Sequence, residues 1–116
     1  MQEGSYAEVL DFIKKEAGGL GAGYHVNAEK IPAIQMACGI FDQMVHEFDC
    51  SEFTIGANKK GCGVTFVLEC FDMVLRDGTN HMFFDLISVM DLFRFSKAKE
   101  NTVRAEFVME NVWRCD

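Results

Sequence analysis

EFTIGANKKGCGVTFVLECFDMVL, residues 52–75, is the stretch that decides the fold class. It opens with a short run of β-favouring residues, 52–58, and Asn58-Lys59-Lys60-Gly61 then has the composition of a turn. The run that follows, 63–75, is apolar on both of its alternating faces, which is typical of a strand that is covered on both sides. The stretch therefore predicts two antiparallel strands, the second of them central in a sheet.

Downstream of this hairpin, the sequence predicts two more strands. Asp77-Gly78 marks a turn, and residues 103–113 alternate between apolar and charged side chains, as in a half-buried strand. The segment 81–95 between them also fits a helix, but it lies between two strand-like segments and is joined to them by short turns. We interpret it as a strand, which completes an antiparallel meander of about four strands.

Upstream of the hairpin, the pattern changes to helical spacing. Ser5 and Glu8 form a capping box, and Gly18-Gly19 ends a first helix over about 5–18. Asn27 caps a second helix over about 28–48, whose apolar residues recur on one side. The intervening GGLGAGYHVN, residues 18–27, is interpreted as a flexible connector. The prediction is an α+β domain in which two N-terminal helices pack on a curved sheet and leave a cone.

Composition bounds the class of protein. The 116 residues are 49% apolar with one proline, which predicts a single ordered domain over 1–116. The net charge of −7 disfavours nucleic acid as a partner. No apolar run is long enough to span a membrane and no signal peptide is visible, so we expect a soluble, cytoplasmic protein.

The cysteines and histidines do not predict a cofactor. Five cysteines, an odd number without a CxxC pair, suit reduced thiols. The three histidines are widely separated and lack a metal-ligand spacing. We therefore expect no metal site and no cofactor.

The segment VMDLFRF, residues 89–95, with a polar turn and Val103-Arg104-Ala105-Glu106 leading to Trp113, resembles the C-terminal hairpin of the NTF2-like superfamily. That superfamily includes the SnoaL-like polyketide cyclases and the ketosteroid isomerases. Together with the preceding helix and strands, the resemblance covers roughly residues 28–114. It implies a cone-shaped domain with a pocket for a small apolar ligand, and a function similar to that of an isomerase or cyclase.

Asp91 is the candidate catalytic residue. Within a strand over 81–95 it shares a face with Phe93 and Phe95, and a carboxyl group in apolar surroundings favours its neutral form, which donates a hydrogen bond. The resemblance matches Asp91 to the acid of the isomerase oxyanion hole. Asp85 has the same parity, although a bulge or the opposite facing of the strand would place both carboxyl groups in water. The candidate ligand-binding residues are Tyr24, His25, Asp72, Asp85, Phe93 and Trp113.

Two functions from different classes remain open. The first is binding of a small apolar ligand, with or without catalysis. The alternative is an acidic protein-interaction module, such as an inhibitor, an immunity protein or a dimerisation module, without catalysis. The location of the eleven Phe and seven Met residues discriminates between them. A closed cavity with convergent Asp, Tyr or His groups favours the first function, and a filled cone with an exposed acidic face favours the second.

Two further predictions concern burial. Phe41, Phe48, Phe66, Phe93, Phe107 and Trp113 are expected to be largely buried. The outer sheet face, with Val108, Val112 and part of 63–75, is expected to be too apolar to remain in water and to form a homodimer.

Overall fold

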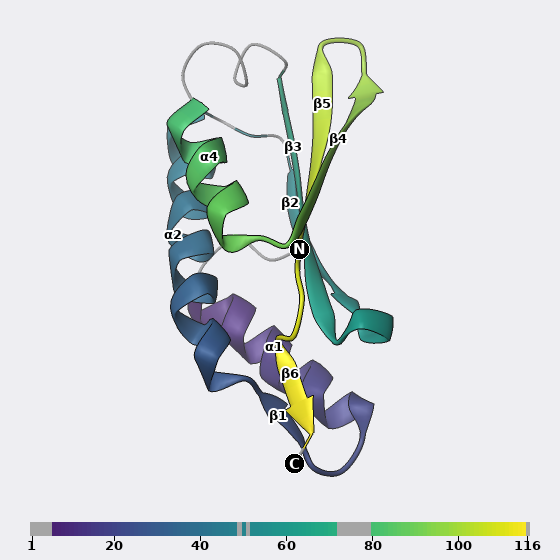
Figure 1. The fold of residues 1–116 in the computed structure, drawn as a ribbon. Helices are drawn as coiled ribbons and strands as arrows, with labels where there is room; N and C mark the ends of the chain where they lie inside the picture. The colour runs from purple at the N-terminus through teal and green to yellow at the C-terminus, as the bar shows by residue number, and fades with distance from the viewer. Residues whose placement is uncertain (1–5, 49, 51, 72–79, 116) are drawn as a thin grey trace.

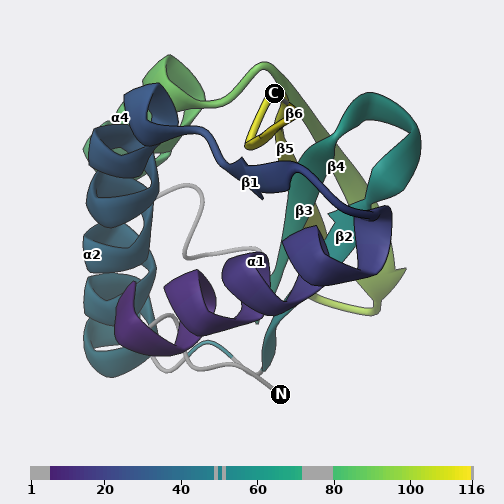
Figure 2. The same cartoon turned by 90° about the horizontal axis from the view of Figure 1, so that it is seen from below.

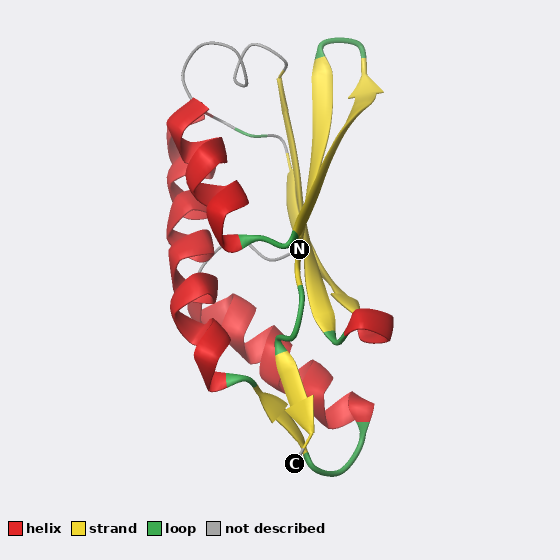
Figure 3. Cartoon of the chain, viewed as in Figure 1, coloured by secondary structure: helices red, strands yellow, loops and turns green. Residues whose placement is uncertain are grey.

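The chain folds into two layers, with helices on one side and strands on the other (Figures 1 and 3). The computed structural model describes residues 6–48, 50, 52–71 and 80–115. In the described residues, no helix is both long enough and apolar enough to cross a membrane.

In the part of the chain that the structure describes, three α-helices form the helical layer. α1 is Tyr6–Leu20 and α2 is Ile31–Phe48, close to the predicted ranges. A short 3-10 helix, η1 (Ala28–Lys30), precedes α2, and the side chain of Asn27 caps it by accepting a hydrogen bond from the backbone N–H of Glu29. α4 is Asn80–Val89. α2 lies between the other two helices and packs against both (Figure 2).

The main sheet has four strands in the order β2-β3-β5-β4, and every neighbouring pair is antiparallel. β2 and β3 are the predicted hairpin, and the short 3-10 helix η2 forms its turn. The α+β class with a curved four-stranded antiparallel sheet is therefore confirmed. The bounds are β2 Glu52–Asn58, η2 Lys59–Gly61, β3 Gly63–Phe71, β4 Leu92–Lys99 and β5 Thr102–Met109.

The strand predicted over 81–95 is wrong. Residues 80–89 form α4, and the strand begins only at Leu92. β3 and β4 are both antiparallel to β5, so they run parallel to each other, and parallel strands require a crossover connection rather than a turn. α4 lies in this connection, and its residues Met82, Phe83 and Leu86 are buried on the helical side. The turn predicted at Asp77-Gly78 lies outside the described residues.

The final strand also ends earlier than predicted. β5 ends at Met109, and Asn111 has a left-handed backbone with φ 56°. The chain then turns into β6 (Trp113–Cys115), which pairs with β1 (Tyr24–Val26) as a separate two-stranded sheet. Part of the predicted flexible connector is therefore an ordered strand, held by residues from the other end of the chain.

Aromatic rings fill the space between the sheet and the helices. Phe41 of α2 lies 4.8 Å from Phe53, 5.2 Å from Phe66 and 5.9 Å from Phe107, measured between ring centroids. Of the six aromatic residues predicted to be buried, Phe41, Phe66, Phe107 and Trp113 are buried, and Phe48 is partly buried. Phe93 is exposed, because β4 is an edge strand.

The outer face of the sheet carries ion pairs. Arg104 of β5 contacts Glu69 at 3.8 Å and Glu106 at 3.1 Å, and Glu106 also contacts Arg94 of β4 at 3.0 Å. Val112, which was expected on this face, is fully buried, so that part of the prediction is wrong. The homodimer that was predicted from this face stays a prediction.

Candidate functional site

Asp91 does not lie in an apolar pocket, as the strand interpretation required. It precedes β4, and its side chain is 41% exposed. Its Oδ2 accepts a hydrogen bond of 2.7 Å from the backbone N–H of Glu110 and lies 3.9 Å from Nζ of Lys30. These contacts tie the start of β4 to the end of β5, so the expected orientation of Asp91 is corrected to a solvent-facing one.

Two other carboxylates, Asp85 and Asp72, were predicted as site residues. Asp85 lies on α4 and is exposed, so the shared strand parity that was meant to bring it to Asp91 does not exist. Asp72 lies outside the described residues. Among the described residues, no group of three or more His, Cys, Asp or Glu side chains could hold a metal ion.

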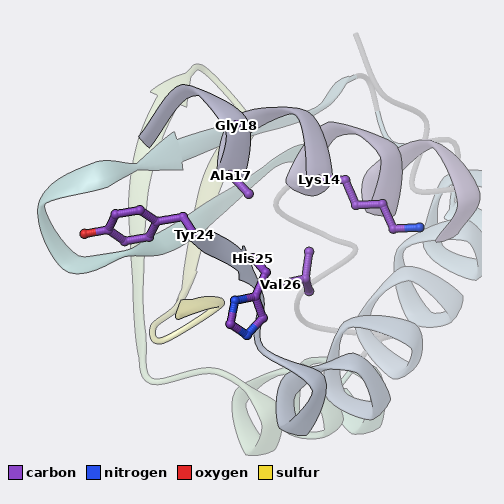
Figure 4. A pocket seen from close by; sticks show the side chains of 6 residues that line it. All are labelled: Lys14, Ala17, Gly18, Tyr24, His25 and Val26. Carbon is purple, nitrogen blue, oxygen red and sulfur yellow. The ribbon is translucent and has the colours of Figure 1, made fainter. Parts of the chain in front are cut away.

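Tyr24 and His25 lie together in β1 and line an open depression of about 430 Å³ beside α1 (Figure 4). Lys14, Ala17, Gly18 and Val26 complete its lining. The Tyr24 hydroxyl and the Lys14 ammonium group point in opposite directions (Figure 4). The depression therefore combines an apolar lining with polar groups that do not converge on one point.

Trp113 has a structural position. It is buried, its Nε1 donates a hydrogen bond of 2.8 Å to the backbone carbonyl of Ile13, and it pairs with Val26 in the β1–β6 register. The indole therefore links β6 to α1 by a hydrogen bond. Its only ring N–H is used inside the protein, so it is not available to a ligand.

The feature that the sequence did not predict is the exposed edge position of β4. Every residue of β4 is exposed, and among the described strands β4 is the last of the sheet and pairs only with β5. Phe93 and Phe95 lie opposite Phe107 and Ala105 of β5, so their side chains share the helix-facing side of the sheet. They remain 49% and 42% exposed, and Leu92 on the opposite face is 57% exposed.

The exposed rings continue the aromatic core to the surface. Phe95 lies 5.7 Å from Phe93, 5.7 Å from Phe83 and 6.2 Å from Phe107, between ring centroids. Phe83 and Phe107 are buried. We call Phe93 and Phe95, with the backbone of Leu92–Lys97, the β4 edge. It combines a rigidly supported apolar surface with one row of backbone groups that no described strand pairs with.

The alternation of Phe93 and Phe95 with polar residues was visible in the sequence. In a meander, however, the third strand is interior, and the same residues are then expected to be covered. Only the strand order β2-β3-β5-β4 places them at an edge.

A scan against protein-family models, a search of curated proteins and a search of solved structures each found no match to this chain. The candidate site is therefore argued from its own geometry.

Proposed function

We propose that the chain is a protein-interaction module that docks an extended segment of a partner protein along the β4 edge. The observation that carries the proposal is an exposed edge strand whose two phenylalanines are half-exposed. An unpaired strand edge offers alternate N–H and C=O groups to a new strand, and side chains beside it supply specificity. Large exposed aromatic residues on a rigid support are typical of interaction surfaces.

The packing of the described residues supports this function. Phe41 is buried and in ring contact with Phe53, Phe66 and Phe107, and Phe53 is in ring contact with Phe66; all four are buried. These rings therefore occupy part of the space where an enclosed apolar cavity was expected.

The test is a selection of peptides from a random display library on the immobilised protein, with peptides of about ten residues, longer than an average strand. Phe93→Gln removes an apolar ring from the β4 edge without changing its charge and should weaken binding of the selected peptides at least about tenfold. Met36→Gln is the matched control, because Met36 is 46% exposed on α2, away from β4. Peptides that bind Phe93→Gln as well as they bind the original chain would show that β4 is not the docking site.

Binding of a small apolar ligand, which the NTF2-like resemblance implies, stays a prediction. The depression beside Tyr24 and His25 is where we expect it, because its lining is mainly apolar. Ligand-observed NMR with a fragment set tests it, with Gly18→Trp as the variant that fills the depression and Gly39→Trp on α2 as a substitution of the same size outside it; a Cβ at either glycine meets nothing within 4 Å. Loss of binding in the first variant alone is the expected result.

A further inference from the structure

The charge of the β4–β5 hairpin is opposite to that of the rest of the chain. Residues 92–109 contain four basic side chains and two acidic ones, which gives +2. Because the whole chain carries −7, the remaining residues carry −9. The hairpin is therefore basic on an acidic protein, with Lys97 and Lys99 toward its turn and the acidic Asp91 and Glu110 flanking its base.

Two of these basic groups have their charges satisfied inside the protein and two do not. Arg94 and Arg104 form ion pairs with Glu106, and Arg104 also contacts Glu69. Lys97 and Lys99 are exposed, and within the described part of the chain no ion pair involves either of them. Two lysine ammonium groups at the end of β4 are thus available to a bound segment.

We propose that the segment docked on β4 is acidic, with Asp or Glu residues beside a pair of apolar residues that are two positions apart. This inference rests on the proposed docking function and names the chemistry of the partner. An acidic segment is attracted by Lys97 and Lys99 and by the basic hairpin as a whole. Its apolar residues cover the exposed surfaces of Phe93 and Phe95.

The β4–β5 register specifies where each kind of residue belongs. Phe93, Phe95 and Lys97 lie opposite Phe107, Ala105 and Val103, so all three are on the helix-facing side. A strand added beside β4 then has two apolar residues next to the phenylalanines and an acidic residue next to Lys97. On the other face, an acidic residue lies beside Arg94, whose side chain is 72% exposed.

The register also limits the length of the docked strand. It shifts between Lys97 and Lys99, which is a β-bulge or similar irregularity. Bulges in edge strands bend the strand away and interrupt regular pairing. The regular docking surface is therefore Leu92–Lys97, and Lys99 contributes its charge beyond the end of the pairing.

A second copy of this chain fits the edge less well than an acidic segment does. A dyad-related pairing of two β4 strands would bring two hairpins of the same charge, +2 each over residues 92–109, to one interface. Like charges that face each other across two strands are destabilising. Self-association is therefore an alternative outcome of the test.

The experiment analyses the peptides selected on the immobilised chain. Their sequences should be enriched in Asp and Glu, with two apolar residues two positions apart and an acidic residue two positions from one of them. Their synthetic fluorescent forms should bind more weakly as NaCl rises from roughly 50 to roughly 500 mM. The double substitution Lys97→Glu/Lys99→Glu should weaken binding at least about tenfold. Lys15→Glu/Lys60→Glu is the matched control, because it changes the net charge equally at two exposed positions outside the hairpin.

The outcomes separate this inference from the proposed function. Peptides that lose affinity for Phe93→Gln but are not acidic, or that bind Lys97→Glu/Lys99→Glu unchanged, overturn the acidic partner and leave docking at β4 standing. Peptides insensitive to Phe93→Gln overturn the docking function itself. Sedimentation of the chain alone as a dimer that Phe93→Gln dissociates would identify a second copy as the occupant and overturn the inference.

Discussion

Asp91 has a different environment from the expected one, because it precedes β4 and does not lie within a strand. On a strand among phenylalanines it would be a neutral acid; ahead of β4 it is a solvent-facing acceptor for the N–H of Glu110. The carboxylate therefore links the start of β4 to the end of β5 by a hydrogen bond.

The hydrogen bond of Asp91 predicts an effect of its substitution on the free energy of unfolding. Asp91→Ala removes the acceptor and the contact with Lys30, and we expect a loss of about 1 kcal/mol in the free energy of unfolding by urea denaturation. Asp91→Asn retains an oxygen acceptor and should lose less. Equal stability of the alanine variant and the original chain would show that the contacts of Asp91 contribute nothing to the free energy of unfolding.

In the described part of the chain, Cys38 is the residue whose pKa is shifted most by burial. It is fully buried on α2, and burial, with a smaller effect of the Asp42 carboxylate, raises the pKa of its thiol from 9.0 to about 12. A thiol reacts as the thiolate, so we expect Cys38 to be inert toward thiol reagents in the folded chain.

This shift predicts a dependence of stability on pH. Above pH 9.0 the thiol ionises in the unfolded chain but stays protonated in the folded one until about pH 12, so the unfolded state binds fewer protons. The contribution of Cys38 is therefore complete below pH 9.0 and decreases as pH rises toward 12. Denaturant titrations across this range should show a steeper loss for the original chain than for Cys38→Ala. Parallel profiles would contradict the shift.

At the scale of elements, the local parts of the fold could be predicted and the long-range parts could not. Helical spacing and the Asn27 cap indicate α2, and period-two alternation indicates β2 and β3, because these signals depend on neighbours in the sequence. The pairing of β1 with β6 joins Tyr24 to Cys115, and no local pattern records a partner that distant.

The segment 80–95 shows most clearly where prediction from the local sequence pattern fails. Met82, Phe83 and Leu86 have helical spacing, and the assumption of a meander outweighed it. The crossover that makes β3 parallel to β4 is a property of the whole sheet. The same error concealed the candidate site, because an exposed phenylalanine at position 93 follows only from the edge position of β4.

Gly63 tests the contact between the start of β3 and the end of β5. A Cβ at Gly63 would lie 2.5 Å from the backbone oxygen of Met109 and 3.1 Å from Cα of Glu110. We expect Gly63→Ala to lower the free energy of unfolding by roughly 1–3 kcal/mol, since backbone must move to accommodate it.

Gly56 of β2 provides the control for this substitution, because nothing lies within 4 Å of its hypothetical Cβ. Gly56→Ala should leave stability within about 0.5 kcal/mol. Thermal or urea denaturation of both variants measures the difference. Similar effects at the two positions would contradict the close approach of β3 and β5.

At the scale of the whole molecule, the helical layer and the basic hairpin together define the docking surface. α2 and α4 lie on one side of the sheet (Figure 1), and buried aromatic rings pack between α2 and the strands β2, β3 and β5. β4 lies at the uncovered margin, with two lysines at its end in a chain of net charge −7. This separation of charge steers an acidic segment toward one edge and away from the rest of the surface.

Amide hydrogen exchange by NMR, with and without a selected acidic peptide, tests docking at β4 most directly. A new strand hydrogen-bonds the outward-pointing N–H groups of an edge strand, which are alternate residues. We predict that the peptide slows exchange at alternate amides of Leu92–Lys97 and leaves the amides of β1 beside the depression unchanged. Unchanged exchange throughout β4, or protection confined to β1 and α1, would contradict the account.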